Sequence, residues 1–135
     1  MITERIQRKA RDAADKKWQK KIYVSPAIGL GIYNNSCMYN AVNKCMSGES
    51  AAVVECVVVD SDKVTAHYIN MQEDGSFIDY TLGWHYSGCD YRLVRYVPQT
   101  EWGSINRSLI NLKKKICEPV KRVKSLFCID DNDIC

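Results

Sequence analysis

Residues 64–82 have the sequence VTAHYINMQEDGSFIDYTL, which predicts two β-strands joined by a short turn. The strands are expected at 64–71 and 77–82, because β-branched and aromatic residues are frequent in both. Between them lies Glu73-Asp74-Gly75, and an Asp-Gly pair is a strong signal for a tight turn. The segment therefore predicts an antiparallel hairpin.

The type of turn decides which side chains share a face of the hairpin. In a type I turn with Gly75 in the left-handed bulge position, Gln72 pairs with Ser76. In that register Asp79 lies diagonally to His67 on one face of the sheet. A two-residue turn shifts the register by one and sends Asp79 to the opposite face. The sequence is compatible with both turns.

Further strands and a helix surround the hairpin. The Val-rich run 53–60 predicts a buried strand, and residues 91–97 predict another. Residues 37–47 predict a short helix, because polar residues can cap its start and Ser47-Gly48 can end it. We therefore expect an α+β core over residues 24–98, in which a Cys-bearing helix packs on an antiparallel sheet of about four strands.

The positive charge of the chain lies at its two ends. The net charge is +3, but residues 1–21 hold eight Lys or Arg against three Asp or Glu, and residues 101–128 hold seven against two. Both ends show helical spacing of apolar residues, which predicts basic amphipathic helices at 3–20 and 101–127. Their charged faces are either solvated or attract phosphates or an acidic protein.

Each of these helices carries an apolar stripe. In the first, the stripe comprises Ile2, Ile6, Ala10, Ala13 and Trp18; in the second, it comprises Ile105, Leu109, Leu112, Ile116, Val120, Val123 and Phe127. Pro119 removes a backbone donor inside the second stripe, so we expect a kink or break near Cys117. The helices flank the core in a single domain of residues 1–135.

The composition excludes several classes of protein. With 46% hydrophobic and 26% charged residues in 135, the chain is globular rather than disordered. The longest uncharged apolar stretch, 24–33, is too short to span a bilayer. No apolar segment of a signal peptide follows the basic N-terminus, so we expect a cytoplasmic protein.

The seven cysteines include no C-x-x-C pair, and only two histidines accompany them. A zinc site is therefore not expected, and neither a metal, a cofactor nor a disulfide is expected to be needed. In a reducing compartment, most of the cysteines are expected to be small buried side chains. Those with apolar neighbours, and so expected in the core, are Cys45, Cys56, Cys117 and Cys128.

Cys37 is the candidate nucleophile. It lies in the first turn of the predicted helix, where the helix dipole and unpaired amides favour the thiolate. A thiolate nucleophile needs an imidazole to transfer protons and a third group to orient that imidazole. His67 and Asp79 supply these groups if the bulged turn is present. The alternative is structural: a buried cysteine, a strand histidine bonded to a carbonyl, and an aspartate that caps a turn.

Other candidates lie near these residues. His85, in a loop between two glycines, is the alternative base. Asn40 lies near the Cys37 face of the helix and is a candidate contact for the oxyanion or the substrate. We expect it to fix the helix against the hairpin in preference to acting in catalysis. Trp84 and Tyr86 either line a substrate cleft or fill the core.

The order of these residues resembles that of small papain-like and transglutaminase-like proteins. The resemblance covers about residues 33–83, and the strings that carry it are Cys37-Met38-Tyr39-Asn40-Ala41, His67-Tyr68-Ile69-Asn70 and Asp79-Tyr80-Thr81. It implies Cys37 as nucleophile, His67 as general acid and base, and Asp79 as the orienting carboxylate.

The resemblance also implies an oxyanion hole, formed by the Cys37 amide and one nearby donor. Gly31 stands where papain-like enzymes have a glutamine, so Asn34, Asn35 or the Tyr33 hydroxyl is the candidate second donor.

The sequence thus predicts a thiol-dependent hydrolase or acyltransferase that acts on an amide, ester or thioester in a protein or peptide-like substrate. Two alternatives remain open. One is a catalytically silent binding or inhibitor protein of the same fold, such as phages use to block a larger target. The other is a nucleic-acid-binding module that uses the basic helices. No membrane partner is expected.

Overall fold

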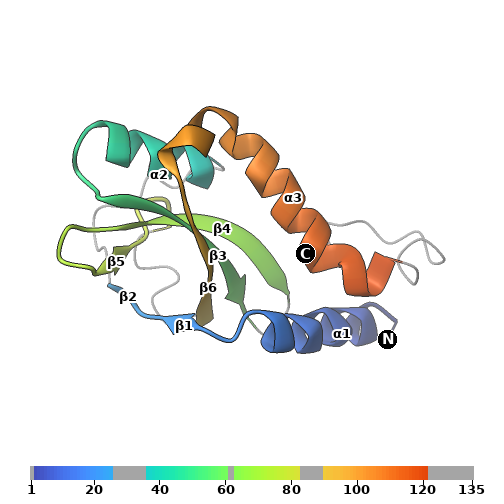
Figure 1. The fold of residues 1–135 in the computed structure, drawn as a ribbon. Helices are drawn as coiled ribbons and strands as arrows, with labels where there is room; N and C mark the ends of the chain where they lie inside the picture. Colours follow the sequence, from blue (N-terminus) through green and yellow to red (C-terminus); the bar gives the residue numbers. More distant parts are fainter. Residues whose placement is uncertain (1, 26–35, 61–62, 83–89, 122–135) are drawn as a thin grey trace.

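The structure, a computed structural model, describes residues 2–25, 36–60, 63–82 and 90–121 (Figure 1). Its helices are α1 (Ile2–Lys17), α2 (Cys37–Met46) and α3 (Ile105–Cys117), with 3-10 helices η2 (Gln99–Ser104) and η3 (Glu118–Val120) on either side of α3. Its strands are β1 (Lys21–Ile22), β2 (Val24–Ser25), β3 (Ala52–Val59), β4 (Val64–Met71), β5 (Phe77–Ile78) and β6 (Asp90–Val97).

The six strands form one sheet in the order β1-β6-β3-β4-β5-β2. All pairs are antiparallel except β2 with β5. Because β1 and β2 follow each other in the chain yet pair with opposite ends of the sheet, the sheet curls until it is nearly closed. The α+β class is confirmed, and the four expected strands form the antiparallel middle of the sheet, β6-β3-β4-β5. The expected strand number falls short, because β1 and β2 extend the sheet to six strands and β2 pairs parallel to β5. The two missed strands have two residues each, too few to show any pattern.

The two faces of the sheet differ in what covers them. On the outer face, Val57, Val59, Val64 and Ala66 pack against Trp18 of the α1 end and residues of α3. On the inner face, apolar side chains from all six strands meet in one cluster: Ile22, Val24, Val54, Cys56, Val58, Ile69, Met71, Phe77, Tyr91 and Leu93. The alternation of β3 side chains between the two clusters is the period of two that a strand imposes.

The terminal helices largely follow the expected stripes. In α1 the buried positions are Ile6, Ala10 and Ala14, and Trp18 directly after the helix is buried as well, so Ala14 rather than Ala13 faces the core. The C-terminal helix was expected to begin at residue 101. In the structure that part of the chain is the 3-10 helix η2, and α3 begins at Ile105. The expected break near Cys117 is confirmed, because α3 ends there and η3 contains Pro119. The rest of the expected helix lies outside the described residues.

The cysteines correct one expectation. Cys56 is buried and free, and Cys45 is free but half-buried. Cys117 is buried as expected, yet it is disulfide-bonded, and its partner lies outside the described residues, as does Cys128. Spacing alone could not show this bond. Within the described parts of the chain, no cluster of metal-ligating side chains occurs, and no helix is long and apolar enough to cross a membrane.

Candidate active site

The β4–β5 turn has the bulged form. The Gln72 amide donates to the Ser76 carbonyl at 2.8 Å, and the Gly75 amide donates to the Gln72 carbonyl at 2.9 Å. Gly75 has φ +86°, a left-handed conformation that favours glycine. In the resulting register Asn70 faces Ile78, which is the pairing that brings Asp79 to the His67 face. This condition of the triad hypothesis is confirmed.

Strand β5 ends directly before Asp79, not at Leu82 as expected. The Asp79 Oδ1 atom accepts the backbone N–H groups of Thr81 and Leu82 at 3.1 and 3.0 Å. An aspartate that bonds the backbone two and three residues ahead stabilises a turn and competes with the strand. Asp79 is therefore a turn residue whose second oxygen remains available.

That second oxygen bonds the candidate base. His67 Nε2 lies 2.8 Å from Asp79 Oδ2, and the Tyr91 hydroxyl donates to the same oxygen at 2.7 Å. Both partners of this pair are buried, and Asp79 has no exposed surface. Burial alone would raise the pKa of Asp79, but the bond to His67 and its charge, with the Leu82 amide and the Tyr91 hydroxyl, lower it. Asp79 is held as a carboxylate.

Cys37 is the first residue of α2 and half-buried. The first intrahelical bond runs from the Asn40 amide to the Ser36 carbonyl at 2.9 Å, so the amides before it have no partner within the helix. Burial raises the pKa of the Cys37 thiol. Hydrogen bonds from His67 and from the Tyr68 amide, together with the charge of His67, lower it, and the net pKa is below the ordinary 9.0.

The imidazole therefore lies between a thiol and a carboxylate. Burial would lower the pKa of His67, but its bonds to Asp79 and Cys37 outweigh this and raise the pKa to about 10. Because Nε2 is bound to Asp79, Nδ1 is the ring nitrogen left for Cys37. The charge of the ring therefore favours the thiolate form of Cys37, and a thiolate beside an imidazolium is the charged pair of a cysteine nucleophile with its acid.

Asn40 has the structural role expected of it. Its Nδ2 donates to the Thr81 hydroxyl at 2.9 Å, so it ties α2 to the turn that holds Asp79. A second tie comes from Asn70, whose Nδ2 donates to the Ala41 carbonyl at 2.9 Å and the Ala52 carbonyl at 3.2 Å. These bonds fix the helix that carries Cys37 against the strand that carries His67.

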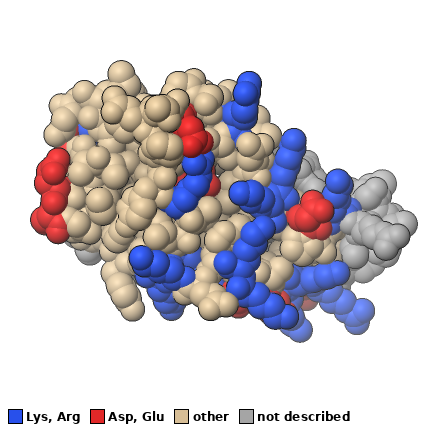
Figure 2. All heavy atoms as spheres, in the orientation of Figure 1, with Lys and Arg blue, Asp and Glu red and all other residues tan. Residues whose placement is uncertain are grey.

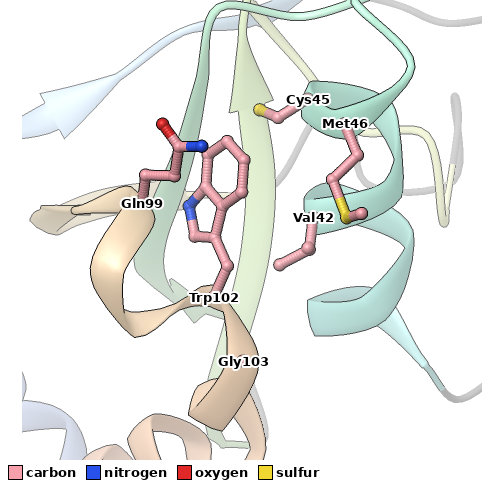
Figure 3. A pocket seen from close by; sticks show the side chains of 6 residues that line it. All are labelled: Val42, Cys45, Met46, Gln99, Trp102 and Gly103. Carbon is pink, nitrogen blue, oxygen red and sulfur yellow. The ribbon is translucent and has the colours of Figure 1, made fainter.

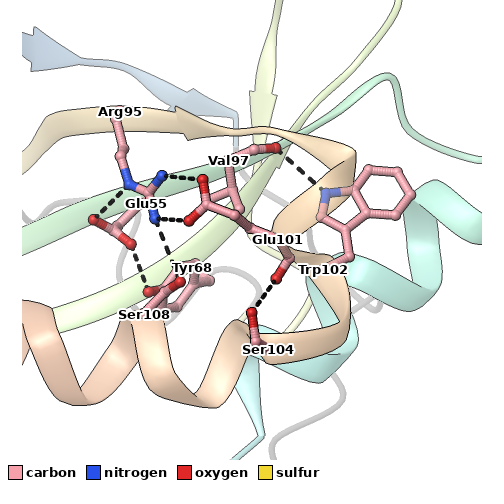
Figure 4. A network of polar contacts seen from close by, with 8 residues as sticks. All are labelled: Glu55, Tyr68, Arg95, Val97, Glu101, Trp102, Ser104 and Ser108. Atoms are coloured by element: carbon pink, nitrogen blue, oxygen red, sulfur yellow. Dashed lines mark hydrogen bonds and ion pairs between the residues drawn. The ribbon is translucent and has the colours of Figure 1, made fainter.

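A polar network lies on the opposite face of β4 (Figure 4). The Tyr68 hydroxyl donates to buried Glu55 at 2.6 Å, and Arg95 donates to the other Glu55 oxygen at 3.3 Å. Arg95 also donates to both Glu101 oxygens at 2.9 and 3.0 Å and to Ser108 of α3 at 3.3 Å. Burial and Glu55 raise the pKa of Tyr68, so its hydroxyl stays a donor. The network fixes the strand residue whose amide contacts Cys37.

A groove of about 580 Å³ lies elsewhere, between α2 and η2 (Figure 3). It is lined by Val42, Cys45, Met46, Gln99, Trp102 and Gly103. Val42, the lining residue of α2 nearest to Cys37 in sequence, lies five positions along the helix from it, a rise of roughly 7.5 Å. Since no triad residue lines it, the groove is not where the candidate chemistry takes place.

The structure thus brings Cys37, His67 and Asp79 together from three separate segments. Asn34, Asn35, Trp84 and the alternative base His85 lie outside the described residues. Tyr91 and Thr81 were not anticipated, because their contacts with Asp79 and Asn40 join distant parts of the chain and leave no local signal. Comparison with known proteins finds no match to a family model, a curated protein or a solved structure.

Proposed function

We propose that this protein is a thiol-dependent hydrolase or acyltransferase that acts on an amide, ester or thioester carbonyl. The observation that supports this most is the 2.8 Å bond between His67 Nε2 and Asp79 Oδ2, beside a thiol whose pKa the same ring lowers. The order and arrangement of the three groups agree with the resemblance to papain-like and transglutaminase-like proteins, so we propose that class for the chain.

In the first half of the reaction the Cys37 thiolate attacks the carbonyl carbon of the substrate. A C–S bond forms, and the carbonyl electron pair moves to the oxygen, whose negative charge the unpaired amides at the start of α2 can bind. His67 then gives its proton to the leaving amine, alcohol or thiol as the C–N, C–O or C–S bond breaks. An acyl-enzyme on Cys37 and a neutral imidazole remain.

In the second half His67 acts as a base. It removes a proton from water or an acceptor amine, which attacks the thioester carbon, and Cys37 leaves as a thiolate. Asp79 keeps the ring oriented through Nε2 and balances its positive charge in both halves. Tyr91 and the two turn amides hold Asp79 in place, so we infer that they position the base without touching the substrate.

The proposed substrate is a protein or peptide-like carbonyl compound, and the mechanism needs neither a metal nor a cofactor. A cytoplasmic location stays a hypothesis. The disulfide at Cys117 weighs against it, because disulfides are rare in reducing compartments.

The proposal is tested with a chloroacetamide probe at neutral pH and peptide mapping of the labelled cysteines. Cys37 is expected to react well ahead of Cys45, a free thiol on the same helix whose pKa burial raises. Labelling of Cys37 should fall strongly in His67→Ala, and Cys45 serves as the internal control. Equally slow labelling of both cysteines would contradict an activated nucleophile and leave a binding protein of this architecture.

A further inference from the structure

Helices α1 and α3 form one strongly basic surface, separate from the candidate active site. The two helices contact each other and lie at the same end of the molecule (Figure 1). Helix α1 carries six Lys or Arg and three Asp or Glu, and α3 carries four Lys or Arg and no acidic residue. In Figure 2 most of the Lys and Arg side chains lie over this half, among a few acidic ones, and a further acidic group lies at the opposite end.

The cations of this surface are exposed and available. We define the α1–α3 surface by seven exposed side chains: Arg5, Arg8, Lys9, Lys16, Lys113, Lys114 and Lys115. Within the described parts of the chain none of the seven forms an ion pair. By contrast, Arg92 and Arg95 of β6 are bonded to carboxylates. The arginines of β6 are thus paired within the fold, whereas the seven cations that define the α1–α3 surface can reach an anion outside the chain.

The apolar content of the surface argues against a protein partner. Protein interfaces contain a buried apolar centre in addition to charges. Among the described side chains of α1 and α3, Ile110 is the one large apolar side chain that is exposed. The groove between α2 and η2 does not include this surface. Binding here would depend on charge alone.

The shape of the surface favours a long, regularly charged polyanion. An α-helix of 16 residues is about 24 Å long, and duplex DNA presents one negative charge per roughly 1.7 Å of its axis. Along α1 the cations extend from Arg5 to Lys16, and α3 adds three consecutive lysines at 113–115. Proteins that bind single strands use exposed aromatic side chains to stack bases, and the described part of this surface presents none. A duplex backbone therefore fits better than unpaired bases.

We propose that the α1–α3 surface binds the phosphate backbone of double-stranded nucleic acid without reading its sequence. The proposal does not rest on the chemistry of Cys37. Seven cations on two adjacent helices are enough to contact about six phosphates. The log–log slope of affinity against salt is then about −5, so affinity should fall about 10³-fold between 50 and 200 mM salt.

The experiment measures the anisotropy of a labelled DNA duplex against the full chain over this range of salt. In Lys113→Ala/Lys115→Ala the slope should become shallower by about 1.8, because each phosphate contact contributes about 0.9. The control Lys44→Ala/Lys63→Ala removes the same charge from other elements and should keep the slope of the unaltered protein. Both double variants are compared by thermal melting, so that unfolding is not taken for lost binding.

Three results would overturn the proposal: no binding of the duplex at low salt, equal losses in the two double variants, or binding of polyglutamate as tight as that of the duplex. The last result would indicate a site for acidic proteins. Cys37→Ala should bind the duplex as the unaltered protein does, whether or not the thiol is catalytic.

Discussion

Replacing Asp79 by Asn tests how far the carboxylate activates Cys37. Asparagine keeps the size of the side chain, and its oxygen can still accept the amides of Thr81 and Leu82. Its Nδ2 group then faces His67 Nε2 and the Tyr91 hydroxyl, where Asp79 now accepts bonds of 2.8 and 2.7 Å. The substitution therefore removes a negative charge and places an amide donor against two other hydrogen-bond donors at a buried position.

The magnitude follows from the bond that is lost. A hydrogen bond to a charged group contributes roughly 1.5–3 kcal/mol, which corresponds to about one to two pKa units. The pKa of His67 should fall by that amount from about 10, which still leaves the ring charged at pH 7. The loss therefore acts through the orientation of the ring, which the bond to Asp79 no longer holds toward Cys37. A positioning bond of that strength corresponds to a fall of about 10- to 100-fold in the rate of Cys37 alkylation at pH 7.

The assay is alkylation by iodoacetamide, followed by mass spectrometry of the peptide that contains Cys37. Asp74→Asn is the matched control, because it makes the same chemical change at an exposed position of the same hairpin, and it should leave the rate unaltered. Equal rates for Asp79→Asn and the unaltered protein, both folded, would refute the reasoning that Asp79 acts on the thiol through His67.

Three further predictions concern stability. Gly75→Ala should lower the free energy of unfolding in urea by about 1 kcal/mol, because Gly75 has a positive φ that alanine disfavours. Gly103→Ala is the control, since Gly103 has an ordinary backbone conformation and open space around it, and equal effects of the two substitutions would contradict the role of the bulged turn. Glu55→Gln should cost roughly 2 kcal/mol because it weakens buried bonds, and the exposed control Glu49→Gln should cost clearly less. Similar melting temperatures of the two variants would argue against the network. The raised pKa of His67 predicts a stabilising contribution that is full below pH 6.5 and lost as pH rises through about 10; a His67→Gln variant with the same alkaline stability profile would exclude it.

The hairpin shows how far sequence reasoning could go. Strand β4 was predicted with its observed bounds, since its β-branched and aromatic residues act locally. The choice between two registers was not available from sequence, because Asp-Gly serves both turns. The structure adopts the register that puts Phe77 in the inner cluster and Asp79 beside His67. Burial of a whole face, not the turn alone, distinguishes the two registers.

What the sequence missed depends on contacts between distant segments. Strands β1 and β2 exist only because the sheet curls enough for one short stretch to pair with both of its ends. The Tyr91 hydroxyl reaches Asp79 from another strand, and no spacing in the sequence predicts that contact. The buried stripe of α1 contains Ala14 where the sequence predicted Ala13, because the buried side chains follow one another in steps of four residues.

The most direct test of the central claim is the pH titration of the Cys37 thiol itself, followed by thiolate absorbance. The variant used keeps Cys37 and replaces by serine Cys45 and Cys56, the other cysteines that are free among the described residues. We expect the thiolate to form below the ordinary pKa of 9.0, and the titration to move upward in the same background with His67→Gln. A Cys37 pKa at or above 9.0 that does not respond to the loss of His67 would contradict the account.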